Sequence, residues 1–382
     1  MNEITRLHAA DYGPEEAAMQ AYLAAGAKRA TELGNRGPIR FTADGKVHPD
    51  ILEAYWRCGF YVFEGVLKPD ELADIEADIK DILDRLPVER GAAADAKGRP
   101  ALAAGLKAPT LFWSRPLGDP LGGTSLAAGR HPVKMFEPEA AADAPKEVVY
   151  LILGALQFSE AHLRVYGHPQ LLAVAAAVNG DDFVPFNEAM FIKEPGRGAS
   201  VAWHQDGVTH WNSPEWDQGS HGFNLMAQLY GCTPANGVWV VPGSHKLGKV
   251  DIKAAAAGSG RLPDAVPIVC APGDVAITNR QAVHGSFANT SKDWRVTLNM
   301  GFHRRRSVLG VQGGGMHNEA AVYDAERIHR RARLIGYGID ARRQRFPHET
   351  PYAYAPLADE TYYWDAAAKA DIADYNLFDL SI

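Results

Sequence analysis

The stretch of sequence that decides the fold is Arg295-Val296-Thr297-Leu298-Asn299-Met300-Gly301-Phe302. Successive side chains of a strand point to opposite faces of its sheet. Here apolar residues occupy every second position, whereas Arg295, Thr297 and Asn299 share the other face. The alternation predicts a strand with one face in an apolar core and the other lined by polar side chains.

Arg295 is the charged residue on the polar face of this strand. An arginine that faces into a barrel needs an anion, because an unpaired buried charge is costly. Its planar guanidinium suits a carboxylate bound through two hydrogen bonds. Two interpretations follow: a structural salt bridge to an Asp or Glu of the chain, or a site for an acidic ligand.

Short runs rich in β-forming residues surround this strand and are separated by Gly, Pro and Asn. The runs, with the decisive stretch as the last, are Phe183–Lys193, Ser200–Asp206, Phe223–Gly231, Val238–Val241, Val266–Cys270, Asp274–Thr278, Ala282–Ala288 and Trp294–His303. About eight closely spaced short strands predict a sandwich or barrel rather than an alternating α/β unit.

Helical patterns flank the predicted strands on both sides. They cover Glu15–Leu33, Pro69 to about Leu86, Phe158–Val178 and Ala320–Leu334, whereas residues 88–145 predict long loops with short helices. We therefore expect three parts: an N-terminal helical extension (1–46), a β-domain with helical N-terminal support (47–304) and a C-terminal extension that packs on the barrel (305–382).

A second polar pattern, Trp203-His204-Gln205-Asp206, lies on an earlier predicted strand. The strand period of two puts His204 and Asp206 on one face and close together. They are two thirds of a 2-His-1-carboxylate set, which binds Fe(II) and leaves positions open for substrate and oxygen. His284, on a later predicted strand, is the natural third ligand. A lone histidine on a strand is more often a hydrogen-bonded core residue than a ligand, and it is Arg295 that favours a site here.

The composition argues against several classes of protein. The 382 residues are 46% hydrophobic and 22% charged, and the net charge of −7 gives no overall field to attract nucleic acid or an anionic membrane. The longest apolar stretch, Val148–Leu156, is far shorter than the roughly 20 residues of a membrane span. The three cysteines are widely spaced without a CxxC pair, and the first residues lack the order of a secretory signal. We expect a cytoplasmic protein that binds neither nucleic acid nor membrane.

Beyond these patterns, residues 47–304 resemble a known family. The matching pieces follow in its order and spacing: Cys58-Gly59-Phe60-Tyr61-Val62-Phe63-Glu64-Gly65-Val66-Leu67, Trp203-His204-Gln205-Asp206, Thr233-Pro234-Ala235-Asn236-Gly237, Val241-Pro242-Gly243-Ser244-His245-Lys246, Ala271-Pro272-Gly273-Asp274 and His284-Gly285-Ser286. This set is similar to that of the phytanoyl-CoA dioxygenases, which are Fe(II)- and 2-oxoglutarate-dependent oxygenases. The resemblance implies a double-stranded β-helix (jelly-roll or cupin-like) core in a mainly β chain with flanking helices (α+β).

The resemblance also implies the residues of the catalytic centre. Iron would be held by His204, Asp206 and His284, and Arg295 would bind the distal carboxylate of 2-oxoglutarate. Asp206 is intact, whereas related halogenases carry Ala or Gly at this position, so we expect hydroxylation rather than halogenation.

Further residues are expected around the two small molecules. The predicted co-substrate contacts are Thr297, Gln228 and Met190, and the predicted substrate contacts are Asn187, Trp203 and Trp211. Met190 lies on one face of its strand, with Asn187 and Lys193 on the other, so only one set can face the pocket. A solvated, outward-facing Lys193 is the more ordinary outcome.

We therefore expect an enzyme that uses Fe(II), 2-oxoglutarate and O₂ to hydroxylate a small organic substrate, with release of succinate and CO₂. Two alternatives keep the barrel without using the oxo acid: a cupin-type metalloenzyme and a non-catalytic metal-binding module. The sequence leaves the substrate open and does not choose between a monomer and a homodimer.

Overall fold

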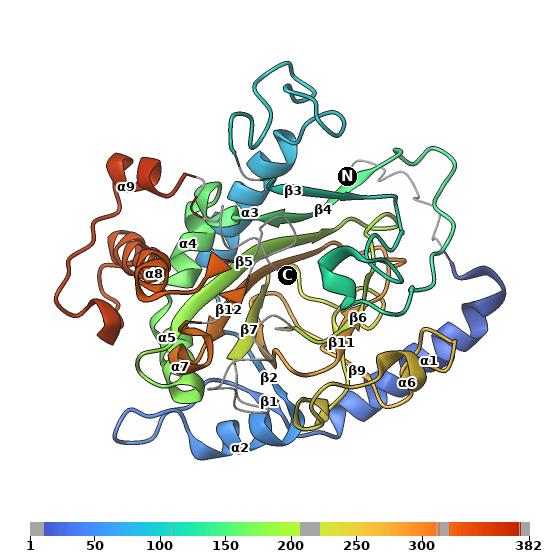
Figure 1. Cartoon of the computed structure of the whole chain (residues 1–382), viewed down its shortest axis with the longest axis horizontal. Coiled ribbons are helices and arrows are strands. Elements are labelled where there is room, and N and C mark those ends of the chain that lie inside the picture. The colour runs from blue at the N-terminus through green and yellow to red at the C-terminus, as the bar shows by residue number, and fades with distance from the viewer. Residues whose placement is uncertain are drawn as a thin grey trace.

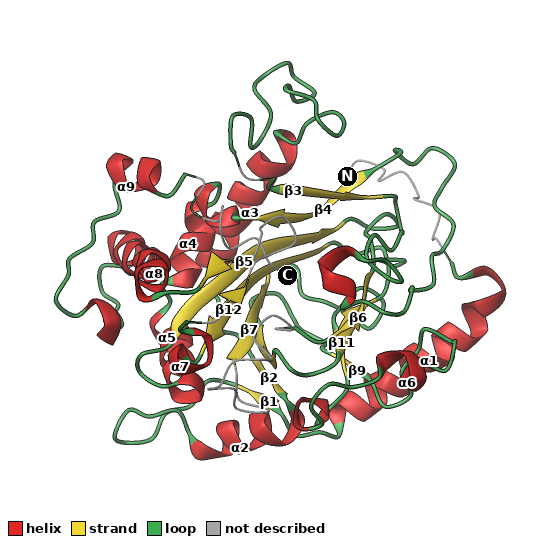
Figure 2. Cartoon of the chain, viewed as in Figure 1, coloured by secondary structure: helices red, strands yellow, loops and turns green. Residues whose placement is uncertain are grey.

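The fold is given by a computed structural model, which describes residues 11–107, 109–206, 222–310, 312–313, 321–373 and 375. Two β-sheets lie at its centre, and helices cover the outer sides of both (Figure 1 and Figure 2). This mixed arrangement confirms the expected α+β class with a double-stranded β-helix core.

The two central sheets differ in size. The larger has eight strands in the order β1 (Arg36–Gly37), β2 (Phe60–Phe63), β10 (Val275–Asn279), β7 (Gly222–Gln228), β12 (Arg295–His303), β5 (Val184–Lys193), β4 (Val148–Leu153) and β3 (Leu111–Ser114). The smaller has four strands in the order β6 (Val201–His204), β11 (His284–Ser286), β8 (Trp239–Val240) and β9 (Val266–Pro267). A separate pair is formed by β13 (Gln312–Gly313) and β14 (Ala321–Val322).

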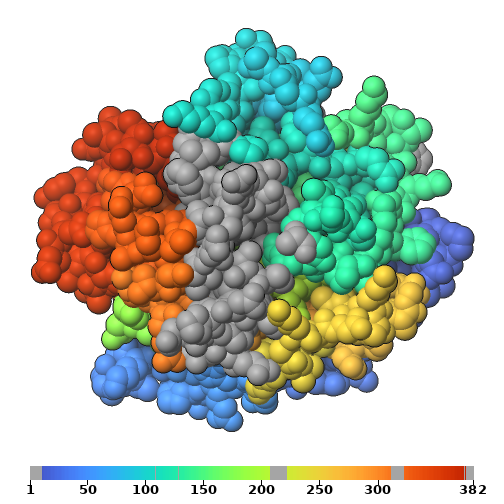
Figure 3. Space-filling view, in the orientation of Figure 1, coloured from blue at the N-terminus to red at the C-terminus, as the bar shows by residue number. Residues whose placement is uncertain are grey.

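Helices lie along the outer sides of these sheets. The α-helices are α1 (Glu16–Thr31), α2 (Pro49–Cys58), α3 (Pro69–Asp84), α4 (Glu160–Tyr166), α5 (Pro169–Asn179), α6 (Ile252–Ala256), α7 (Arg305–Val308), α8 (Ala325–Arg345) and α9 (Ala366–Asp371). Short 3₁₀ turns occur at Gly13–Glu15, Leu126–Gly129, Ala155–Gln157, Ser244–Lys246 and Ala355–Leu357. In the space-filling view, the C-terminal helices (orange to red) lie at the opposite edge of the molecule from α1 and α6 (Figure 3).

The decisive stretch forms β12, between β5 and β7 in the larger sheet. Its apolar residues at positions 296, 298, 300 and 302 are at most 1% exposed and share one core with residues of α4, α5 and α8. On the opposite face, Arg295 and Asn299 line a cavity enclosed by both sheets. The predicted alternation is confirmed, and it separates the apolar core from the cavity.

All eight strands predicted between residues 183 and 303 are present, as β5 to β12. The structure corrects the prediction of loops over residues 88–145, because β3 lies in this segment and pairs with β4. The inner residues of β4 are buried on both faces. A strand of this kind is a continuous apolar run without the alternation that identifies a half-buried strand.

The helical pattern at 158–178 forms two helices rather than one. Pro169 begins α5, and its ring disfavours helical geometry at the residue before it. A side chain at Gly167 would collide with the backbone of Gly338 in α8. The chain therefore turns where the end of α4 lies directly against the backbone of α8.

Antiparallel pairing brings the predicted site residues together from distant parts of the sequence. β12 aligns Arg295 with Lys193 of β5 and Thr297 with Gln228 of β7. In the smaller sheet, His284 of β11 pairs directly with His204 of β6. Among the described helices, none has both the length and the apolar character to span a bilayer.

Candidate active site

A cluster of two histidines and one aspartate lies in the cavity between the sheets. His204 ends β6, Asp206 lies two residues further on, and His284 begins β11. Asp206 Oδ1 is 3.4 Å from His204 Nε2, and Asp206 Oδ2 is 3.8 Å from His284 Nε2. All three residues are buried, and one ligand atom from each lies within 4.8 Å of the others. Such a cluster can hold one metal ion.

Hydrogen bonds to the backbone fix the orientation of both imidazoles. His204 Nδ1 lies 2.8 Å from the carbonyl oxygen of Ala202, and His284 Nδ1 lies 2.9 Å from that of Ala282. A carbonyl oxygen only accepts, so each Nδ1 carries a proton, which leaves Nε2 as the atom of each ring that can bind a metal. Burial, together with the nearby His204, lowers the pKa of His284 to about 4, so this ring is neutral near pH 7.

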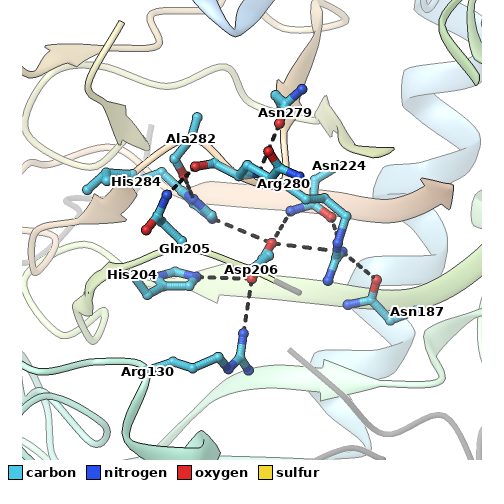
Figure 4. Close-up of polar contacts among 12 residues, drawn as sticks. Arg130, Asn187, His204, Gln205, Asp206, Asn224, Asn279, Arg280, Ala282 and His284 are labelled. Atoms are coloured by element: carbon cyan, nitrogen blue, oxygen red, sulfur yellow. Dashed lines mark hydrogen bonds and ion pairs between the residues drawn. The ribbon is translucent and has the colours of Figure 1, made fainter. Parts of the chain in front are cut away.

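Polar side chains surround the Asp206 carboxylate (Figure 4). Asn224 Nδ2 donates to Oδ2 at 2.6 Å, and Arg280 Nη1 lies 3.8 Å from the same oxygen. Arg130 Nη1 approaches Oδ1 at 3.4 Å. Burial acts to raise the pKa of Asp206, but the charge of Arg280 outweighs this effect and holds the pKa well below its usual range. The carboxylate is therefore ionised and able to bind a cation.

Arg280 also fixes one wall of the cavity. Its Nη1 donates to Asn187 Oδ1 at 3.0 Å and to Asn224 Oδ1 at 2.7 Å. Gly301 of β12 makes room for this network, because a Cβ there would collide with Asn187 Oδ1. One buried guanidinium thus orders two of the three carboxamides that line the cavity.

Arg295 lies at the other end of the cavity and is 2% exposed. Its Nε donates to Thr297 Oγ1 at 2.9 Å, and its Nη1 donates to the carbonyl oxygen of Asn236 at 3.3 Å. Thr297 in turn donates to Gln228 Oε1 at 2.7 Å. Among the described residues, no carboxylate forms an ion pair with Arg295, so none of them supports the structural salt-bridge interpretation.

The cavity joins the His-Asp-His cluster to Arg295. Its lining residues are Asn187, Phe191, Val201, His204, Asp206, Asn224, Met226, Val238, Thr278, His284, Gly285, Ser286, Arg295 and Asn299. The structure thus brings Asn187 and the predicted metal ligands into one cavity with Arg295. Thr297 and Gln228 are not among the lining residues. Thr297 accepts a hydrogen bond from Arg295, and Gln228 accepts one from Thr297.

Two predicted pocket residues point away from this cavity. Asn187 and Lys193 lie on the face of β5 toward the smaller sheet. Met190 therefore lies on the opposite face, in the apolar core with Leu298. Trp203 packs in an apolar cluster with Trp239 on the outer side of the small sheet, and its Nε1 donates to the carbonyl oxygen of Gly260 at 2.8 Å. The predicted contacts of Met190 and Trp203 with the small molecules are therefore wrong. Trp211 lies outside the described residues.

Other residues of the site were not predicted. Arg280 lies in the turn between β10 and β11, where no periodic pattern indicates which way a side chain points. Arg130 reaches Asp206 from the long segment between β3 and β4. Next to it, His131 is fully buried, and its ring lies 4.3 Å from that of His204. The alternation of β7 does place Asn224 on the same face as Gln228, but it does not show the contact with Asp206.

A double-stranded β-helix that offers two imidazoles and one ionised carboxylate defines a class of proteins, the non-haem metalloenzymes with a facial set of three ligands. This donor set fits Fe(II). The buried Arg295 in the same cavity fits an acidic organic ligand.

Comparison with known proteins identifies the family. Residues 55–297, more than half of the chain, match the phytanoyl-CoA dioxygenase (PhyH) family. The chain belongs to this family and is a non-haem oxygenase that uses Fe(II), 2-oxoglutarate and O₂. No curated protein matches the chain.

Several solved structures are similar to this chain. AviO1 from Streptomyces viridochromogenes Tue57 is 24% identical, with 66% of this chain and 92% of that chain covered and a TM-score of 0.45. The iron-bound structure of EctD from S. alaskensis is 20% identical, with 69% and 79% covered and a TM-score of 0.46. EvdMO1 is 24% identical, with 65% of this chain covered and a TM-score of 0.45, and the match spans only 48% of EvdMO1.

Proposed function

We propose that the protein couples oxidative decarboxylation of 2-oxoglutarate, which yields succinate and CO₂, to hydroxylation of a small organic substrate. In this proposal His204, Asp206 and His284 hold Fe(II), and Arg295 binds the distal carboxylate of 2-oxoglutarate. The observation that carries it is a buried arginine with no described carboxylate partner, in the same cavity as the His-Asp-His cluster.

Each group of the chain has a defined task in this reaction. Bound iron would supply the oxygen chemistry, and three protein ligands leave positions open for the oxo acid and O₂. Arg295, held by Thr297 and the carbonyl of Asn236, binds and orients the co-substrate. The carboxylate of Asp206 remains in place as a ligand, which supports hydroxylation rather than halogenation.

The substrate would bind against the polar wall of the cavity. Asn187 and Asn224 are held by Arg280, and Thr278 and Asn299 line the same cavity. We assign Asn187 to substrate binding because its carboxamide lines the cavity and its orientation is fixed by Arg280. A small polar molecule suits this wall better than a long apolar chain.

Iron-dependent succinate formation tests the proposal. Protein loaded anaerobically with Fe(II) is given 2-oxoglutarate and then O₂, with and without candidate substrates. We expect succinate release that requires iron, and Arg295→Ala should raise the apparent KM for 2-oxoglutarate about 100-fold. Arg333→Ala, which removes an exposed ion pair with Asp371, is the matched control and should leave KM unchanged.

The alternatives make different predictions in the same assay. A cupin-type metalloenzyme would bind iron but release no succinate, and turnover of its own substrate would persist in Arg295→Ala. A non-catalytic module would release no succinate in any condition, and that result would refute the proposal.

A further inference from the structure

Lys193 is a buried lysine at the end of β5, and the expectation of a solvated side chain is wrong. It is 1% exposed. Its Nζ donates to Ser286 Oγ at 2.7 Å and to the carbonyl oxygen of Phe287 at 2.6 Å. No described carboxylate forms an ion pair with it. Lysine is almost never fully buried unless it is paired, because loss of hydration disfavours its charge.

Lys193 lies beside the arginine that we assign to the co-substrate. The two residues face each other across the β5–β12 pairing. Burial, followed by the repulsion of Arg295, lowers the pKa of Lys193 well below its usual range, and Asp119 opposes this only in part. An anion bound beside Arg295 would offset both effects and favour the ammonium form of Lys193.

The contact with Lys193 sets the direction of the Ser286 hydroxyl. With an anion bound nearby, the ammonium form of Lys193 is favoured, and an ammonium group only donates. Ser286 Oγ must then accept from Lys193 and direct its own hydrogen elsewhere. Because Ser286 lines the cavity together with Arg295, that hydrogen is available to a ligand.

We propose that Lys193 is a positioning residue for the 2-oxoglutarate site. It holds Ser286 as a hydrogen-bond donor toward the co-substrate and adds positive charge beside Arg295. The carbonyl of Phe287 keeps its ammonium group in place. This inference rests on the proposed function, because the anion it serves is the distal carboxylate of 2-oxoglutarate.

Lys193→Met tests the role directly, because it keeps an unbranched side chain of similar length and removes the charge and the donors. We expect the KM for 2-oxoglutarate to rise about 10-fold or more, while kcat at saturating co-substrate changes less than about threefold. The melting temperature without 2-oxoglutarate should be unchanged or higher, because a buried charge is lost. The rise in melting temperature caused by 2-oxoglutarate in the anaerobic iron-loaded protein should shrink.

Two further variants separate positioning from a structural role. Ser286→Ala should also raise the KM, and the double variant should be little worse than the poorer single variant, since the two residues act as one unit. Lys292→Met, at an exposed lysine in the turn before β12, is the control and should match the wild type.

Two outcomes overturn the inference while leaving the proposed function intact. One is an unchanged KM in Lys193→Met when Ser286→Ala raises it. The other is a lower melting temperature with KM and kcat impaired together, which would mark Lys193 as structural only. If the wild type itself shows neither iron-dependent succinate release nor a thermal response to 2-oxoglutarate, the proposed function fails first.

Discussion

Two arginines, Arg280 and Arg295, lie in the same buried region and differ in how their charge is balanced. Arg280 is 1% exposed, donates to two asparagines and lies 3.8 Å from the carboxylate of Asp206. Arg295 is 2% exposed, and its guanidinium donates to a threonine hydroxyl and a backbone carbonyl, with no described carboxylate in ion-pair distance.

The difference indicates what each arginine is for. The charge of Arg280 is balanced within the protein itself, because it keeps the Asp206 carboxylate ionised. No described acidic group of the protein neutralises the charge of Arg295. This arginine therefore suits a ligand that brings its own negative charge. Burial therefore does not distinguish a structural arginine from a binding arginine, whereas the presence of an acidic partner does.

Removal of each charge should affect folding stability differently. Arg280→Met should lower the free energy of unfolding by about 3 kcal/mol, because Asp206 would remain buried without its main cation. Arg295→Met should stay within about 1 kcal/mol of the wild type, because no described ion pair is broken. Chemical denaturation of the metal-free protein measures both values. Equal destabilisation by the two substitutions would contradict the comparison.

Iron affinity should separate the same two positions. Arg280→Met should weaken Fe(II) binding by about 10- to 100-fold, the usual effect of losing a partner that orients a ligand. Arg295→Met should leave iron binding without 2-oxoglutarate unchanged. Anaerobic Fe(II) titration followed by tryptophan fluorescence provides the measurement. The comparison would be wrong if Arg295→Met weakened iron binding as much as Arg280→Met.

Thr297→Val should give the smallest effect, because it removes one hydrogen bond to Arg295 and leaves its charge in place. We expect the KM for 2-oxoglutarate to rise about fivefold. Steady-state succinate assays measure this change, and Thr297→Ser, which keeps the hydroxyl, should behave like the wild type. A Thr297→Val enzyme with an unaltered KM would show that Arg295 needs no support from this side chain.

Much of the barrel could be predicted because its strands alternate. The period of two in β12 separates the core face from the cavity face. The same rule predicts that His204 and Asp206 lie together, and they do, although β6 ends at His204 and Asp206 follows in the next segment. The rule does not give the absolute orientation of a strand that is buried on both faces. In β5 both Met190 and Asn187 are buried, so only the pairing with neighbouring strands shows which one faces the cavity.

Other parts of the site depend on contacts that leave no local pattern. A lysine near the end of a strand is ordinarily exposed. The burial of Lys193 is explained by its hydrogen bonds to Ser286, the last residue of β11 in the smaller sheet, and to the carbonyl oxygen of the next residue, Phe287. Arg280 and Arg130 project from segments without periodicity, so their meeting at Asp206 depends on the tertiary fold. Trp203 is adjacent in sequence to a predicted ligand, yet strand geometry turns it outward. Being next to a predicted ligand in the sequence is therefore no evidence that Trp203 contacts the substrate.

The backbone carbonyls that hold His204 and His284 come from residues two positions earlier in each chain segment. Folding of the two strands therefore already restricts the rotation of both rings, before any ion arrives. Binding of an ion would then require little further loss of side-chain freedom, because the entropy of ordering both rings is already lost when the strands fold. A centre of this kind would lose and regain its ion while the barrel around it stays assembled, unlike small domains that fold only around their metal.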